Sequence, residues 1–191
     1  MQDIIQQITL PASRDSQAAF ETSAEELIRR HQAVLAGRSH AIRLAVDLLC
    51  HHLLPGDQAG VGPPGLATLT FFSNEGSVQQ LIVEFACPGS VPEMDALGES
   101  LLGGALGATV MLAPTVDGSV GVRVARRSRL PRGDRLGDEL EMKGLRDAVW
   151  LLLLARAWKS VTFHQREGGE VAARLLVPKP VPRRLAKRPS A

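Results

Sequence analysis

The side chains best suited to chemistry lie near positions 50 and 87. Cys50, His51 and His52 are consecutive, and Cys87 is the second cysteine of the chain. Zinc takes three or four ligands in tetrahedral geometry, commonly from spaced pairs of residues. Consecutive residues of a helix point about 100° apart, so three neighbours cannot bind one ion. We therefore predict no metal site and interpret Cys50 as a small buried apolar residue.

Nucleophilic and phosphate-binding motifs are equally sparse. Cys87 with a distant histidine would make a Cys–His pair, but Cys87 stands directly before Pro88 without any flanking signature. No G-x-S-x-G elbow and no Walker A loop occurs. The Gly103–Gly107 segment ends a helical pattern, where glycine is the ordinary stop. The sequence thus predicts no catalytic residue. It leaves enzymatic activity open and favours a protein that is not an enzyme.

Composition indicates one globular domain. The chain has 191 residues, 45% of them hydrophobic, and a net charge of +2. Two cysteines do not form a disulfide framework, and the first residues lack the basic and apolar regions of a signal peptide. The apolar run 148–155 is far shorter than the roughly 20 residues that cross a membrane. We expect a cytoplasmic protein that does not contact membranes.

Hydrophobic spacing gives the expected elements. Residues 1–15 form an N-terminal arm, with a loose or short-strand segment at 3–10. Apolar residues recur at three and four positions in the helices expected at about 16–36 and 39–54. Three later units each place a hairpin after a helix, with a glycine beside an acid in the turn. These units span about 38–86, 94–126 and 144–178.

The predicted fold class is α+β. A single domain at 16–178 is expected to be a two-layer sandwich, in which helices cover one face of a mostly antiparallel sheet built from three β-hairpins. The alternation at 119–124 is typical of a sheet with one wet face. In the central apolar helix, Val149, Leu152 and Leu153 are predicted to share one face against the sheet.

The segment 179–191 is a basic, proline-rich tail. It carries no acid, and Pro180, Pro182 and Pro189 interrupt it. We expect a solubilising tail, so a chain that ends at Pro178 should be as stable as the whole. Contact with nucleic acid is expected only through its cations, without stacking aromatics. Those cations are Lys179, Arg183, Arg184, Lys187 and Arg188.

The order of elements at 16–126 resembles the GHKL-type ATP-binding domain of bacterial anti-sigma-factor and switch-protein kinases. The helix at 42–54 resembles the family's N-box helix, which carries a Glu and, four residues later, a Mg²⁺-binding Asn. Asp47 and His51 stand at the matching positions. The segment Cys87-Pro88-Gly89 stands where the family has its adenine-binding Asp-x-Gly turn, so Gly89 matches the glycine and Cys87 replaces the aspartate. The closing helix and hairpin match either 97–126 or 144–177.

The resemblance implies a bacterial protein and, in the intact family, a site for ATP and Mg²⁺. Here it implies cofactor-binding positions at Asp47, His51 and Gly89. His51 is a poor ligand for a hard cation, and deleting hydrogen bonds to a ligand lowers its affinity. We therefore expect no cofactor, with ATP and Mg²⁺ as the alternative.

Three functions remain open at this point. The first is a non-catalytic regulatory or adaptor domain that binds another protein. The second is a divergent GHKL-type nucleotide-binding kinase or anti-sigma factor. The third is a structural subunit or chaperone that binds its partner by sheet extension. The sequence does not indicate the oligomeric state.

Overall fold

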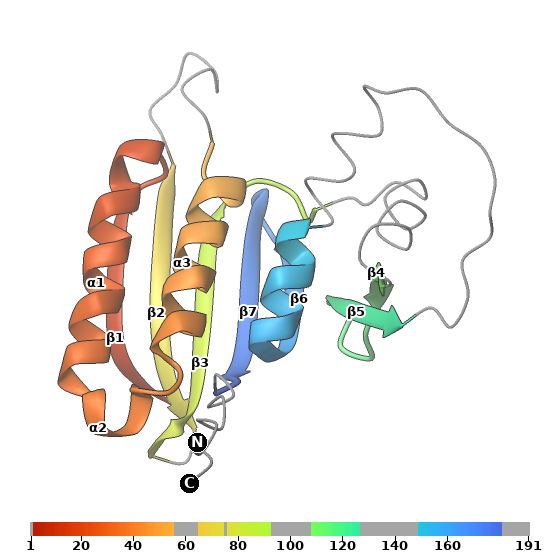
Figure 1. Cartoon of the computed structure of the whole chain (residues 1–191). Coiled ribbons are helices and arrows are strands. Elements are labelled where there is room, and N and C mark those ends of the chain that lie inside the picture. The colour runs from red at the N-terminus through yellow and green to blue at the C-terminus, as the bar shows by residue number, and fades with distance from the viewer. Residues whose placement is uncertain (1, 56–64, 75, 93–107, 127–148, 181–191) are drawn as a thin grey trace, which may run out of the picture.

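The fold is seen in a computed structural model that describes residues 2–55, 65–74, 76–92, 108–126 and 149–180. In these ranges, helices lie on one face of a seven-stranded antiparallel sheet (Figure 1). The predicted α+β class is confirmed. None of the helices in the described ranges is long and apolar enough to cross a membrane.

The elements have the following bounds. The strands are β1 (Gln2–Pro11), β2 (Leu66–Asn74), β3 (Ser77–Pro88), β4 (Ala108–Pro114), β5 (Val120–Arg126), β6 (Trp158–Arg166) and β7 (Glu170–Pro178). The helices are a short 3-10 turn (Arg14–Ser16), α1 (Gln17–Arg30), α2 (Gln32–Leu35) and α3 (Ser39–Leu53). Residues 149–157 belong to a further helix, directly before β6.

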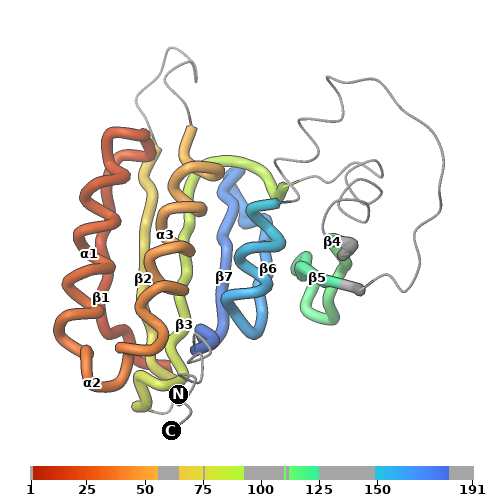
Figure 2. The backbone as a smooth tube through the Cα atoms, in the orientation of Figure 1, coloured from red at the N-terminus to blue at the C-terminus, as the bar shows by residue number. Residues whose placement is uncertain are grey.

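The sheet has the strand order β1-β2-β3-β7-β6-β5-β4, and β7 therefore lies between β3 and β6 (Figure 2). The β3–β7 ladder runs over seven residue pairs, from Ile82↔Leu176 to Pro88↔Glu170. By contrast, β5 pairs with β6 at two positions, Val120↔Phe163 and Gly121↔Thr162. The β4–β5 hairpin, which is paired along its length, is thus joined to the rest of the sheet by a short ladder.

The N-terminal segment belongs to the sheet. β1 pairs antiparallel with β2 along its length, with an irregularity between Ile4 and Gln6. The Gln6 amide also donates to the Ser23 backbone oxygen of α1 at 2.8 Å. Of the two alternatives for this segment, the strand is therefore correct and the loose arm is wrong.

The core lies between the sheet and its helices. Phe71, Phe85 and Phe163 project from three strands with no exposed surface, and Phe20 of α1 meets Phe85 edge to face at 5.4 Å. The Trp158 indole donates to the Ala41 carbonyl at 3.1 Å, a buried hydrogen bond between β6 and α3. A buried N–H or C=O group without a hydrogen-bond partner lowers stability, and this bond gives both groups a partner.

The face without helices carries a cluster of paired charges over β3, β7 and β6. Glu84 alternates with the buried Val83 and Phe85, so it points to the opposite face of β3. Its carboxylate binds Arg166 of β6 at 2.7 Å and lies 3.9 Å from Arg174 of β7. These ion pairs link β3, β7 and β6 from the solvent side.

The apolar helix at 149–157 buries a different set of residues from the one predicted. Leu151, Leu152 and Leu154 are buried, whereas Leu153 is 38% exposed. Leu153 lies about 200° around the helix from Leu151, so both cannot face the sheet. The prediction for Leu152 is confirmed and that for Leu153 is wrong.

These two leucines make a matched pair for measurement. We expect Leu152→Ala to lower the free energy of unfolding by about 2–5 kcal/mol, because it leaves a cavity in the core. Leu153→Ala should cost less than about 1 kcal/mol. Urea denaturation checks both values, and equal losses would contradict the assigned orientation of the helix.

The chain after β7 is anchored to this helix. Val177 adopts φ of 52°, an unfavourable left-handed conformation for a β-branched residue. Beyond it, the Lys179 N–H donates to the Ala157 carbonyl at 2.7 Å, and Lys179 Nζ donates to the Ala155 carbonyl at 2.8 Å. A cation that binds the last carbonyls of a helix stabilises its C-terminus. Lys179 is therefore part of the fold rather than of the tail.

This anchoring changes the expectation for truncation. A chain that ends at Pro178 should be less stable than the full chain by about 1 kcal/mol, since two hydrogen bonds to the helix end are lost. A chain that ends at Pro180 should match the full chain. Lys179→Met separates the Nζ contribution from that of the backbone. Thermal unfolding followed by circular dichroism measures all four, and equal stability of the Pro178 and Pro180 chains would contradict the anchoring role.

Candidate functional site

Helix α3 presents three sides. Its sheet side is buried and includes Ile42, Val46 and Leu49. Arg43, Asp47 and His51 are exposed and follow one another at four-residue spacing, which places them along one line of the helix. His52 lies on a third side. The site residues predicted from the sequence are therefore on the outer surface of the domain.

Asp47 faces α1. Its Oδ1 accepts a hydrogen bond from Gln17 Nε2 at 3.3 Å, and its side chain lines a cavity between the two helices. Within the described residues, no hydrogen bond, ion pair or ring contact joins Asp47 or His51 to Gly89. Asp47 is therefore directed towards α1.

The histidines belong to an aromatic cluster between α3 and the helix at 149–157. His52 stacks on Trp150 with ring centroids 4.7 Å apart and planes 9° apart. Trp150 meets Phe163 edge to face at 5.8 Å, and His51 meets His52 edge to face at 5.0 Å. Stacking of this kind stabilises helix packing, so His52 has a structural role.

Gly89 lies where β3 leaves the sheet. Its φ of 150° favours glycine, and a Cβ there would lie 3.5 Å from Val171. The Gly89 N–H donates to the Gly169 carbonyl at 2.9 Å, and Gln165 donates to the Gly89 carbonyl at 3.1 Å. These bonds tie the exit of β3 to the β6–β7 turn.

Both cysteines are buried and free. Burial raises the pKa of the Cys50 thiol and of the Cys87 thiol to about 12. The Cys87 thiol also donates to the Leu53 carbonyl at 3.4 Å. A protonated, inaccessible thiol is a poor nucleophile. The prediction that Cys50 is a buried apolar residue is confirmed.

We expect neither thiol to react with a chromogenic disulfide reagent at pH 8 in the native protein, and both to react in denaturant. Stability should fall as the pH rises above the ordinary thiol pKa of 9.0, because the unfolded chain then loses protons that the folded chain keeps. Cys50→Ser and Cys87→Ser should each weaken this pH dependence. Rapid labelling of the native protein would contradict the burial.

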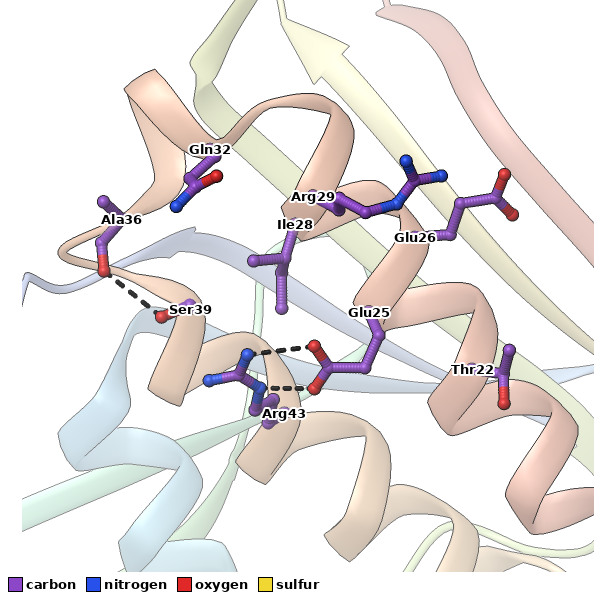
Figure 3. Close-up of a pocket in the computed structure, with 9 residues that line it drawn as sticks. All are labelled: Thr22, Glu25, Glu26, Ile28, Arg29, Gln32, Ala36, Ser39 and Arg43. Atoms are coloured by element: carbon purple, nitrogen blue, oxygen red, sulfur yellow. Dashed lines mark hydrogen bonds and ion pairs between the residues drawn. The ribbon is translucent and has the colours of Figure 1, made fainter.

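A hollowed surface lies between α1 and α3. Two adjoining cavities of about 680 and 620 Å³ share Thr22, Glu25 and Arg43. Figure 3 shows the first of them, with Gln32 and Ala36 at one end and Thr22 at the other. We call the two together the α1–α3 groove. Its remaining lining residues are Ala18, Glu21, Ala24, Glu26, Ile28, Arg29, Ser39, Val46 and Asp47.

A bidentate ion pair divides the α1–α3 groove. Arg43 Nη2 donates to Glu25 Oε2 at 2.9 Å, and Arg43 Nε bonds the other carboxylate oxygen (Figure 3). These hydrogen bonds lower the pKa of Glu25 and raise that of Arg43. Both side chains are half exposed, so the pair orients the groove walls and contributes little to stability.

The α1–α3 groove combines a small apolar floor with charged walls. Ile28, Ala24 and Val46 are buried at its base. Glu21, Glu25 and Arg29 come from α1 at four-residue spacing. The four-residue spacing of these charges can be read from the sequence, but it does not show that they face α3 across a groove. From the sequence, Asp47 was named as a cofactor-binding position, not as a residue of this groove.

No protein-family model matches the chain, and no curated protein matches it. In the part of the chain that the structure describes, no three His, Cys, Asp or Glu side chains gather in a way that could hold a metal ion.

Proposed function

We propose that this chain is a non-catalytic regulatory or adaptor domain that binds another protein through the α1–α3 groove. The observation that carries the proposal is the groove itself: adjoining cavities with charged walls over an apolar floor. A protein segment with an apolar anchor and flanking charges of both signs fits such a surface. Arg29 is exposed at its rim and makes no ion pair among the described residues.

The positions that the GHKL resemblance assigns to nucleotide contacts support a degenerate site. Asp47 accepts a hydrogen bond from Gln17 on the α1 side. The Cys87 side chain is buried and bonded to the Leu53 carbonyl, so it offers no acceptor to an adenine amino group. The divergent nucleotide-binding kinase remains the alternative. It is favoured by Gly89, whose positive φ suits a turn of the kind that the resemblance implies.

Affinity capture from native cell extract tests the proposal, with the full chain as bait. A groove partner should be retained by the wild type and lost with Arg29→Glu, which reverses a charge at the groove rim. Arg156→Glu reverses an exposed charge on the helix at 149–157 and serves as the matched control. A protein captured equally by all three baits would contradict binding through the groove.

Nucleotide binding is tested separately by thermal shift. We expect millimolar Mg²⁺–ATP to leave the melting temperature unchanged, since a bound ligand at a hundredfold excess over its Kd would stabilise the fold by about 2.7 kcal/mol. A clear upward shift that Asp47→Ala abolishes would overturn the non-catalytic function and favour the kinase. Asp15→Ala, which removes another exposed carboxylate, is the control.

A further inference from the structure

Strand β1 forms one edge of the sheet, so half of its backbone groups have no strand beside them among the described residues (Figure 1). Its register with β2 shows which groups these are. Pro11 lies opposite Leu66, and the Ala12 N–H donates to the Gly65 carbonyl at 2.7 Å. Bonded and non-bonded pairs alternate in an antiparallel ladder. Ile8 and Leu10 therefore bond β2, while the N–H and C=O groups of Gln7 and Thr9 point outwards.

The position of Pro11 agrees with this assignment. It falls in the outward-pointing series, where a residue without an N–H does not weaken the ladder to β2. The irregularity between Ile4 and Gln6 lies beyond the other end of this series. Gln6–Pro11 is thus a regular edge that can accept a strand.

Natural proteins protect such edges with charges, usually lysine. β1 has no charged residue from Ile4 to Leu10. The face of α1 that contacts β1 through Ser23 carries Ala19 and the neutralised pair Glu26–Arg30. A second copy can therefore approach this edge without repulsion between like charges.

Exposed apolar side chains near the β1 edge also favour a second copy of the chain as the partner. Ile4 is 58% exposed and Leu66 is 65% exposed, at opposite ends of the β1–β2 pair. Leu66 alternates with the buried Ala67, so it lies on the face without helices. Ile4 lies on the same face, because the irregularity places it opposite Phe72, which follows the buried Phe71. In an interface with two-fold symmetry, each end of the patch meets the opposite end of the other copy. Ile4 would then lie near Pro11 of the second copy, with Leu66 of that copy one strand further away.

We propose that two copies of this chain associate through their β1 edges, antiparallel, with the two-fold axis at Ile8. Gln7 of each copy lies opposite Thr9 of the other, and each such pair exchanges two backbone hydrogen bonds. Ile8 lies opposite Ile8 of the second copy on the helix face. The two sheets become one, and the exposed Ile4 side chain is covered. This inference is independent of the proposed function.

Sedimentation velocity across a concentration series tests the proposal. We expect the wild type to pass from 20.5 kDa to twice that mass as the concentration rises. Thr9→Pro removes an outward N–H and should leave a monomer with unchanged circular dichroism. Thr9→Val keeps the N–H and should still dimerise. A wild type that stays monomeric at all concentrations, or a Thr9→Pro variant that still dimerises, would overturn the proposal.

A charge swap tests the register without a proline. Ile4→Lys with Leu66→Lys places cations two strands apart across the interface, about 10 Å, and should raise the dimer Kd at low ionic strength. Ile4→Glu with Leu66→Lys places opposite charges at the same separation and should lower the Kd relative to the first double variant. Equal Kd values for the two double variants would contradict the register, whatever the effect of Thr9→Pro.

Discussion

The fold depends on the pairing of β3 with β7. This ladder joins the half of the molecule that contains α1 and α3 to the half that contains the helix at 149–157. Contacts on both faces reinforce it. Glu84 binds arginines of β6 and β7 on the solvent face, and on the other face the Trp158 indole donates to the Ala41 carbonyl of α3. Helix α3 is therefore held in place both by the strands of its own half and by β6 of the other half.

The position of α3 in turn decides what its outer residues can do. Because the buried side of α3 is held against the sheet, Arg43 and Asp47 must face α1, and His52 must face Trp150. The charged line of α3 and that of α1 then form the walls of the groove. The Glu25–Arg43 pair spans them at the surface, where it orients both helices more than it stabilises them. The charged wall of the groove and the side packed on the sheet are thus different sides of one helix.

Local patterns predicted the elements well. The three- and four-residue spacing of Ile42, Val46 and Leu49 defined α3 and its buried side, and Gly118, with φ of 80°, lies in a turn that the sequence indicated. Other features could not be read in this way. Residues 151–154 are four consecutive leucines, so no alternation of apolar and polar residues shows which of them faces the sheet. The exposure of Leu153 could therefore not be predicted.

Features that join distant parts of the chain were also inaccessible to sequence reasoning. Spacing placed Asp47 on a helix surface but did not show which neighbour that surface faces. Lys179 was grouped with the basic tail by composition, although its bonds to the helix end make it part of the fold. The place of β7 beside β3 depends on contacts between residues far apart in sequence, which periodicity does not report.

The interior position of β7 has a consequence for synthesis of the chain. β3 is complete long before β7 leaves the ribosome, and until then one edge of β3 lacks the strand it needs. Pairings between residues far apart in sequence form slowly, and open strand edges promote aggregation in the meantime. The nascent chain therefore exposes the unpaired edge of β3 for the time needed to make the residues between β3 and β7.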